Sequence, residues 1–220
     1  SSNCNFKSKQ VFIIKTKDIR NYLSKIASKF FNRKPKNIFA VTGTNGKTSV
    51  ADFFYQILKL NNVSVASIGT LGLKYNDKVL KTNLTSPDTI SIHEQLDFLK
   101  KRKIENVIIE ASSHGLDQKR LHNINFKAGI FTNFSQDHLD YHKTMRKYLN
   151  AKFILFKEIL NKKSTVISDK EIMPFKTLKK ISTKKNLKIV DIKKEFEKIK
   201  KINKELSGDF KIKNLSMAIQ

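Results

Sequence analysis

Short apolar runs alternate with longer helical patterns along most of this chain, and this alternation limits the fold more than any other feature. The runs expected to form strands cover residues 11–15, 38–41, 63–68, 106–110, 127–131, 164–168 and 187–191. Amphipathic helical patterns cover residues 18–31, 48–60, 86–102 and 144–160. Strands that alternate with helices usually pair in parallel, so we expect an α/β fold with a mostly parallel sheet flanked by helices on both faces.

Two local signals refine this expectation. Ser86, Pro87 and Asp88 predict a helix start, with Ser86 as the N-cap and Pro87 in the first helical position. Residues 170–207 are rich in lysine and only weakly patterned, with one expected strand. A length of 220 residues allows one substantial domain, or one domain with part of another.

The segment VTGTNGKTS, which begins at Val41, joins an expected strand to an expected helix. In an α/β sheet, a helix N-terminus at the carboxyl end of a strand attracts phosphate through its free N–H groups. Gly43 and Gly46 would let the backbone wrap around phosphate oxygens. Lys47 would add a positive charge, and the Thr48 hydroxyl could bind Mg²⁺. The general phosphate-loop pattern requires a glycine at the position of Val41, so a chance strand-to-helix turn remains the alternative.

Basic residues strongly outnumber acidic ones. The chain has 44 Lys and Arg against 19 Asp and Glu, a formal net charge of +25. Such a balance can mark a nucleic-acid-binding module, which remains one alternative. The basic residues are spread along the chain and are mostly Lys, whereas base readout and bidentate phosphate contacts favour Arg. We therefore expect solvated surface lysines and no nucleic-acid partner.

The lengths of the apolar runs and the single cysteine bear on where in the cell the protein is expected. No apolar run reaches 18 residues and no secretory leader is evident, so we expect no membrane association. Cys4 is the single cysteine and cannot form an internal disulfide, which fits a reducing compartment. We expect a cytoplasmic monomer.

Four segments, in this order, resemble the Mur ligase family of ATP-dependent ligases, which includes the folylpolyglutamate synthetases. They are VTGTNGKTS (41–49), IEASSHGLDQKRL (109–121), FTNFSQDHLDYH (131–142) and NAKFILF (150–156). The shortened phosphate loop is usual in that family. SSHGL followed by DHLDYH is most similar to the members that add the third amino acid of the peptidoglycan stem. The resemblance implies the P-loop-type fold of the family's central domain.

The resemblance also implies a catalytic set: Lys47, Glu110, His138 and Lys152. ATP would be bound by Gly43, Thr44, Asn45, Gly46, Lys47, Thr48, Ser49 and Asn214. Two Mg²⁺ ions would be held by Thr48, Glu110, His138 and a carbamate that CO₂ forms on Lys152. Without the resemblance, Lys152 would be a solvated helix lysine, Glu110 a solvent-facing strand end, and His138 a hydrogen-bonded loop residue.

By the same resemblance, the UDP-MurNAc-dipeptide substrate would be bound by Thr85, Ser86, Ser112, Gln118 and Arg120. The chain departs from the family pattern at two positions. Some members carry Asn where this chain has Leu84, and the family usually has Asn where this chain has Lys211. We expect one substrate contact and one adenine contact to differ accordingly.

The implied reaction is ATP-dependent amide formation through an acyl phosphate, with meso-diaminopimelate or L-lysine as the added diamino acid. Residues 1–36 would be the tail of an N-terminal UDP-binding domain, and residues 37–220 the central ATP-binding domain. The C-terminal amino-acid-binding domain is expected to be absent, so this portion alone is not expected to complete a turnover. The choice of diamino acid stays open because the deciding residues belong to that domain. A folylpolyglutamate synthetase-like ligase is the nearer alternative.

Overall fold

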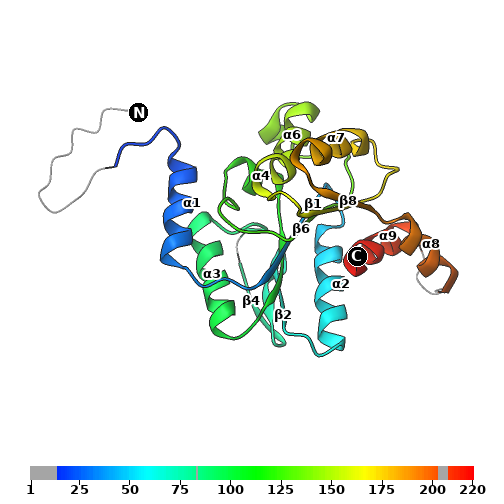
Figure 1. The fold of residues 1–220 in the computed structure, drawn as a ribbon, viewed down its shortest axis with the longest axis horizontal. Helices are drawn as coiled ribbons and strands as arrows, with labels where there is room; N and C mark the ends of the chain where they lie inside the picture. Colours follow the sequence, from blue (N-terminus) through cyan, green and yellow to red (C-terminus); the bar gives the residue numbers. More distant parts are fainter. Residues whose placement is uncertain (1–13, 83, 203–207) are drawn as a thin grey trace, which may run out of the picture.

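A single sheet forms the centre of the molecule in the computed structural model, which describes residues 14–82, 84–202 and 208–220 (Figure 1). Within these residues the sheet has eight strands in the order β4-β3-β2-β5-β1-β6-β7-β8. The strands are β1 (Asn37–Thr42), β2 (Val65–Gly69), β3 (Gly72–Tyr75), β4 (Lys78–Leu80), β5 (Asn106–Glu110), β6 (Ala128–Phe131), β7 (Thr165–Ser168) and β8 (Lys188–Asp191).

Six of these strands, β2, β5, β1, β6, β7 and β8, pair in parallel, which confirms the predicted fold class. The strands β3 and β4 add an antiparallel hairpin beyond β2. The sequence analysis did not predict this hairpin. Its strands of four and three residues are too short to give a clear alternating pattern.

Helices cover both faces of the sheet. They are α1 (Ile19–Phe30), α2 (Lys47–Leu60), α3 (Thr89–Lys101), α4 (Ser113–Asp117), α5 (Leu139–His142), α6 (Met145–Ile154), the π-helical turn η1 (Leu155–Ile159), α7 (Phe175–Lys185), α8 (Lys193–Ile202) and α9 (Asp209–Ile219). Successive side chains of a strand point to opposite faces. Along β5, Ile108 joins the core beneath α2 and α9, whereas Val107 and Ile109 join the larger core beneath α3, α4, α6 and α7.

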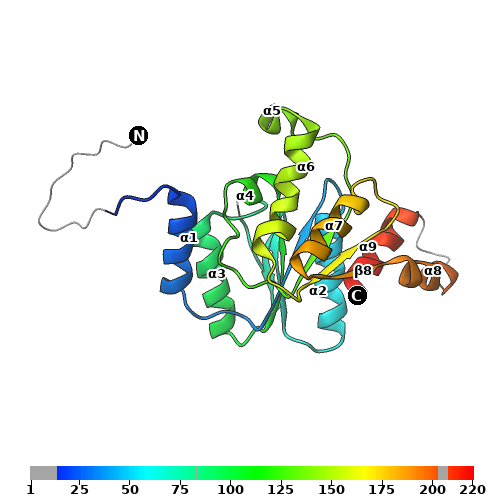
Figure 2. The ribbon, with the colours of Figure 1, turned by 45° about the horizontal axis from the view of Figure 1, so that its top comes forward.

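Helix α1 lies outside this layered body, beside α3, in both views (Figure 1, Figure 2). The Ser24 hydroxyl donates to the His122 carbonyl at 2.6 Å, and Lys119 pairs with Asp18 at the helix start. The helix thus docks on the body through polar and small side chains.

The strand order places three strand ends together. The strand β1 lies between β5 and β6, with Val41 opposite Glu110 and Thr42 opposite Phe131. In parallel sheets, ligands bind at the carboxyl ends of strands where the chain order reverses. The turn after β1, the end of β5 and the segment after β6 therefore meet at one edge.

The predicted start of the third helix is wrong. Helix α3 begins at Thr89, and its N-cap is Asp88, whose Oδ1 accepts from the N–H groups of Ile90 (2.9 Å) and Ser91 (3.1 Å). Ser86 is instead buried, and its hydroxyl donates to the Glu110 carbonyl at 2.8 Å. Both Ser and Asp are good N-caps, and the contact with β5 decides between them.

Other differences concern element boundaries. The helical pattern at 144–160 is divided between α6 and η1. The weakly patterned lysine-rich region contains two helices, α7 and α8, besides the predicted strand. The expected strand at 11–15 falls mostly outside the described residues, and residues 14 and 15 belong to no strand. No helix in the described part of the chain is long and apolar enough to cross a membrane.

Candidate active site

The turn between β1 and α2 is shaped by two glycines with positive φ, Gly43 (146°) and Gly46 (83°). The segment after β6 holds this turn in place. The Thr44 N–H donates to the Asn133 carbonyl at 3.0 Å, and the Asn45 N–H donates to Asn133 Oδ1 at 2.9 Å. The predicted loop is therefore a defined structure anchored to the neighbouring strand end.

Replacing Gly43 by Ala should destabilise the fold. An added Cβ would lie 1.9 Å from Thr132 Oγ1, and the φ value disfavours any L side chain. We expect a loss of about 1–3 kcal/mol, measured as a lower midpoint of urea unfolding. Gly208→Ala is the matched control, because Gly208 also has a positive φ (101°) but a Cβ there would meet no atom within 4 Å. Equal losses in both variants would show that the contact with Thr132 is unimportant.

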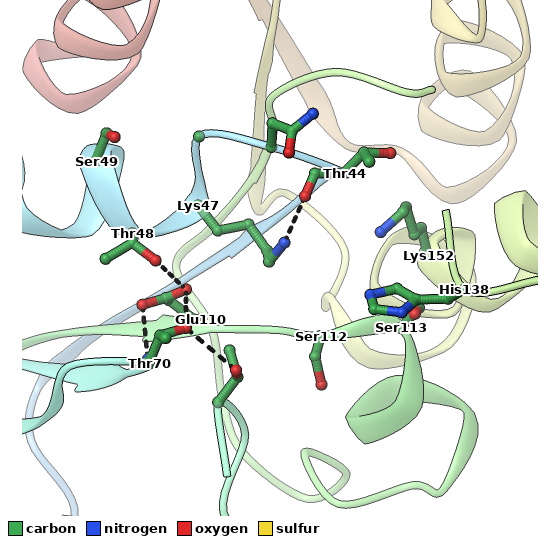
Figure 3. A pocket seen from close by; sticks show the side chains of 13 residues that line it. Thr44, Lys47, Thr48, Ser49, Thr70, Glu110, Ser112, Ser113, His138 and Lys152 are labelled. Carbon is green, nitrogen blue, oxygen red and sulfur yellow. Dashed lines mark hydrogen bonds between the residues drawn. The ribbon is translucent and has the colours of Figure 1, made fainter. Parts of the chain in front are cut away.

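Two lysines, the partly buried Lys47 and the buried Lys152, converge on one carbonyl of the turn. Lys47 Nζ donates to the carbonyls of Thr44 (2.8 Å) and Gly43 (3.1 Å), and Lys152 Nζ donates to the Gly43 carbonyl at 2.8 Å. Figure 3 shows the two ammonium groups pointing toward one another. Burial, together with the nearby charge of Lys47, lowers the pKa of Lys152 to about 7. Burial also lowers the pKa of Lys47, an effect that Glu110 and Asp137 oppose.

Lys152 is only 1% exposed, so the interpretation of this residue as a solvated lysine is wrong. The helix α6 turns it inward beneath Tyr148, whose ring centroid lies 4.3 Å from Nζ. A buried lysine with a lowered pKa holds a large neutral fraction near neutral pH. The side chain can therefore act as an amine nucleophile.

Glu110 lies opposite the lysines and is 2% exposed. Its Oε2 accepts from the hydroxyls of Thr48 (2.9 Å) and Thr70 (3.2 Å), and its Oε1 accepts from the Thr70 N–H (2.9 Å). The interpretation as a solvent-facing strand end is therefore wrong too. Both carboxylate oxygens are held in place beside the first turn of α2.

His138 lies at the start of α5, in a left-handed conformation with φ 51°. It belongs to a cluster of rings in which the His114 ring centroid lies 5.0 Å from that of His138 and 5.4 Å from that of His142. Tyr148 closes the cluster at 5.9 Å from His138. The pKa values of His114 and His142 are both lowered. Burial is the larger cause, and the charge of a neighbouring imidazole is the next.

These groups surround one cavity of about 230 Å³. The predicted site residues that line it are Thr44, Asn45, Gly46, Lys47, Thr48, Ser49, Thr85, Glu110, Ser112, His138 and Lys152. Gly43 does not line the cavity, but its carbonyl accepts from Lys47 and Lys152, which do. The structure thus brings the turn after β1 together with Glu110, His138 and Lys152.

The remaining predicted substrate residues form a network next to this cavity. Arg120 Nη1 donates to the Ser86 carbonyl at 2.8 Å, and its Nη2 donates to Gln118 Oε1 at 2.6 Å. The Ser86 hydroxyl accepts from the Ser112 N–H at 2.9 Å, and Ser112 caps α4 by accepting from the Gly115 N–H. The hydroxyls of Ser86 and Ser112 are therefore hydrogen-bonded within the protein. The Arg120 guanidinium is held at the edge of the site by its bonds to Ser86 and Gln118.

Asn214 lies on the other side of the turn. A Cβ on Gly46 would come within 2.6 Å of Asn214 Oδ1, so the two residues pack closely. Asn214 lines a second cavity of about 240 Å³, together with Thr132, Asn133, Asp169, Ile172, Asp209, Phe210, Lys213 and Met217. Lys211 is exposed and does not line this cavity.

Two cavity residues were missed by the sequence analysis, Thr70 and Ser113. Thr70 directly follows β2, and this position at a strand end could have identified it. Ser113 is 2% exposed and its hydroxyl has no hydrogen-bond partner within the described residues. Ser113 and His138 line the same cavity (Figure 3).

The oxygen donors at this site suit one Mg²⁺ ion as they stand. A second ion would suit the site only if Lys152 were converted to a carbamate. Thr48 Oγ1 and Glu110 Oε2 are hard oxygen donors next to the turn, as Mg²⁺ prefers. An ammonium on Lys152 would repel a cation, whereas a carbamate would supply oxygen ligands beside His138. Within the described residues, no group of three His, Cys, Asp or Glu side chains could hold a metal.

Comparisons with known proteins agree with this geometry. The family profile described as "Mur ligase middle domain" matches residues 41–220. The UDP-N-acetylmuramoyl-L-alanyl-D-glutamate–2,6-diaminopimelate ligase of Bradyrhizobium diazoefficiens is 47% identical over 141 residues, which are 64% of this chain and 29% of that protein. A solved structure of a ligase with the same name has a TM-score of 0.69 at 27% identity, and the match covers 80% of this chain and 36% of that chain.

A folylpolyglutamate synthetase of L. casei shares the fold as well. Its TM-score is 0.67 at 14% identity, over 96% of this chain and 63% of that chain, a likeness of fold alone. The chain spans less than half the length of the curated relatives that it matches. Since the family profile matches most of the chain, the chain belongs to the Mur ligase family and contains the middle domain of that family.

Proposed function

We propose that the protein is the ATP-binding portion of a ligase of peptidoglycan precursor synthesis. The substrate would be UDP-MurNAc-L-Ala-D-Glu, and the amino acid joined to it a diamino acid. The relatives are named as 2,6-diaminopimelate ligases, which favours 2,6-diaminopimelate over L-lysine. Within the family, this likeness of sequence favours such a ligase over a folylpolyglutamate synthetase, which shares the fold at much lower identity.

One observation carries the proposal: Lys47 and Lys152 converge on the Gly43 carbonyl, in the same cavity as the Glu110 carboxylate. The partly buried Lys47 and the backbone of the glycine-rich turn favour a polyanion such as the triphosphate of ATP. A carboxylate at the same place suits a divalent cation bound with that triphosphate. We propose that residues 43–49 hold the phosphates and that Asn214 contacts adenine.

The reaction would then proceed by phosphoryl transfer and acyl transfer. The D-Glu side-chain carboxylate attacks the γ-phosphorus of ATP, and ADP leaves. The amine of the diamino acid attacks the resulting acyl phosphate, and phosphate leaves with formation of the amide. Such transfer depends mainly on alignment and charge neutralisation, which Lys47 and the backbone of the turn would supply.

Magnesium would neutralise charge on the phosphates when bound. For the first ion we propose Thr48 and Glu110 as ligands, and for the second His138 and carbamylated Lys152. The carbamate forms when the neutral Lys152 amine attacks CO₂ and loses a proton, which converts a potential cation into an anion. The depressed pKa of Lys152 supports this step.

We propose Thr85, Ser86, Ser112, Gln118 and Arg120 as the residues around the sugar-peptide. The half-buried guanidinium of Arg120 suits a substrate carboxylate. Residues 37–220 would form the ATP-binding domain, and residues 1–36 would belong to a UDP-binding domain. Helix α1 supports this division, because Ile19 and Phe30 are more than two thirds exposed, as expected for a helix that also contacts another domain.

The test uses the complete ligase that contains this chain. ADP release should require UDP-MurNAc-L-Ala-D-Glu, the diamino acid and Mg²⁺ together. Two results would contradict the proposal. One is ADP release that proceeds equally well with a folate substrate, and the other is ATP binding on which the sugar-peptide has no effect.

Glu110→Gln should lower kcat by about 10²-fold and raise the Mg²⁺ concentration needed for half-maximal rate. The amide keeps the shape of the side chain but removes the charge that attracts the cation. Glu94→Gln, on the exposed side of α3, is the control and should behave as the wild type. An unchanged Mg²⁺ dependence in Glu110→Gln would exclude Glu110 as a metal ligand.

A further inference from the structure

Thr70 contacts two parts of the site at once. Its N–H donates to Glu110 Oε1 at 2.9 Å and its hydroxyl donates to Glu110 Oε2 at 3.2 Å. The same hydroxyl lies 3.1 Å from Thr85 Oγ1. Figure 3 shows Thr70 next to Glu110 with these bonds drawn. Thr70 thus joins the proposed metal ligand to the proposed substrate loop.

The residue before Thr70, Gly69, lies against the same Glu110 carboxylate. A Cβ on Gly69 would lie 2.0 Å from Glu110 Oε1. Only a glycine lets the end of β2 approach so closely that the Thr70 N–H reaches this oxygen. Gly69 and Thr70 therefore fix the position of the Glu110 side chain from one side, and Thr48 fixes it from the other.

The hydroxyls of Thr85 and Thr70 and the Glu110 carboxylate form a chain of hydrogen bonds. The number of available hydrogens determines which oxygen donates in each bond. An ionised carboxylate only accepts hydrogen bonds, and a threonine hydroxyl has a single hydrogen to donate. The Thr70 hydrogen is directed to Glu110, so the hydrogen between the two threonines must come from Thr85. The Thr85 oxygen then has lone pairs free but no hydrogen to donate.

We propose that Thr70 is a positioning residue for Glu110 and, through this chain, a determinant of what Thr85 can recognise. Thr85 accepts a hydrogen bond from an N–H or O–H group of the sugar-peptide, and it does not donate to a carboxylate or phosphate. This inference rests on the proposed function, because it takes Glu110 as a nucleotide-side group and Thr85 as a substrate-side group.

The test compares Thr70→Val, Thr70→Ser and Thr85→Val in the complete ligase. Two quantities are measured: the Kd of Mg²⁺ with a non-hydrolysable ATP analogue, by calorimetry, and the KM for the UDP-sugar dipeptide. Thr70→Val should weaken both by about tenfold, the size of one hydrogen bond to a charged group. Thr70→Ser keeps the hydroxyl and should stay within about threefold of the wild type.

Thr85→Val should raise only the KM, because the Thr70 hydroxyl still donates to Glu110 in that variant. Thr183→Val, on exposed α7, is the matched control and should change neither quantity. The melting temperature of each variant separates misfolding from loss of position. Should Thr70→Val be misfolded, the Kd and KM values of Thr70→Ser and Thr85→Val still test the inference.

Three results would overturn the inference: a Thr70→Val variant with both quantities unchanged, a Thr70→Ser variant as impaired as a folded Thr70→Val, or a Thr85→Val variant with equally weakened nucleotide binding. In each case a wild type that binds both ligands leaves the proposed function intact. A wild type that binds neither ligand would instead remove the proposed function and this inference together.

Discussion

Lys47→Ala should abolish ATP turnover in the complete ligase, with a fall in kcat of about 10³-fold. The Lys47 ammonium lies against the carbonyls of Gly43 and Thr44, at the place where the phosphates would bind. In the proposed reaction its charge would neutralise the transferred phosphoryl group, so alanine would remove an interaction that is strongest in the transition state. Nucleotide binding, followed by calorimetry with Mg²⁺ and ATP, should weaken as well.

Lys59→Ala is the control for this variant. Lys59 lies on the same helix, α2, but is exposed and pairs with Asp77 on the surface. An exposed ion pair contributes little, so the control should keep full turnover. Turnover by Lys47→Ala at more than a tenth of the wild-type rate would show that the turn after β1 does not carry the triphosphate.

Lys152→Ala should lower turnover by about 10²–10³-fold, and a short carboxylate such as formate should restore part of it. The deleted side chain would leave space beside the Gly43 carbonyl, where a small anion could replace the charge of the proposed carbamate. Lys152→Arg keeps a cation but cannot form a carbamate near neutral pH, so it should be equally inactive. Rates are measured at limiting and saturating Mg²⁺.

Lys147→Ala, an exposed substitution on the same helix, is the control. A near-normal rate of Lys152→Ala at limiting Mg²⁺ would exclude the carbamate role. After CO₂ is removed from the wild type, the rate at which added CO₂ restores activity should depend on pH. The amine of Lys152 becomes neutral as pH rises through its pKa of about 7, so at equal concentrations of dissolved CO₂ the enzyme should be reactivated faster at pH 8 than at pH 6.

The sequence pattern predicted the architecture because strand–helix alternation is a local property. The runs at 38–41 and 106–110 became β1 and β5, and the glycines of the turn appear with the positive φ values that only their conformational freedom allows at low cost. The antiparallel hairpin β3–β4 and the cap at Asp88 were not predicted. The hairpin strands are too short to give a clear alternating pattern, and the choice of Asp88 over Ser86 depends on the contact of Ser86 with the distant strand β5.

The residue types and their order determined a parallel α/β sheet with an anchored glycine-rich turn, and they brought Glu110 and His138 to the edge of the sheet where that turn lies. The tertiary structure alone decided the environment of each group. Lys152 is 109 residues from Gly43 in the chain, yet it is buried against the Gly43 carbonyl with a pKa of about 7. Burial and the charge of a distant lysine cause that shift, and both arise only when the sheet and α6 pack together.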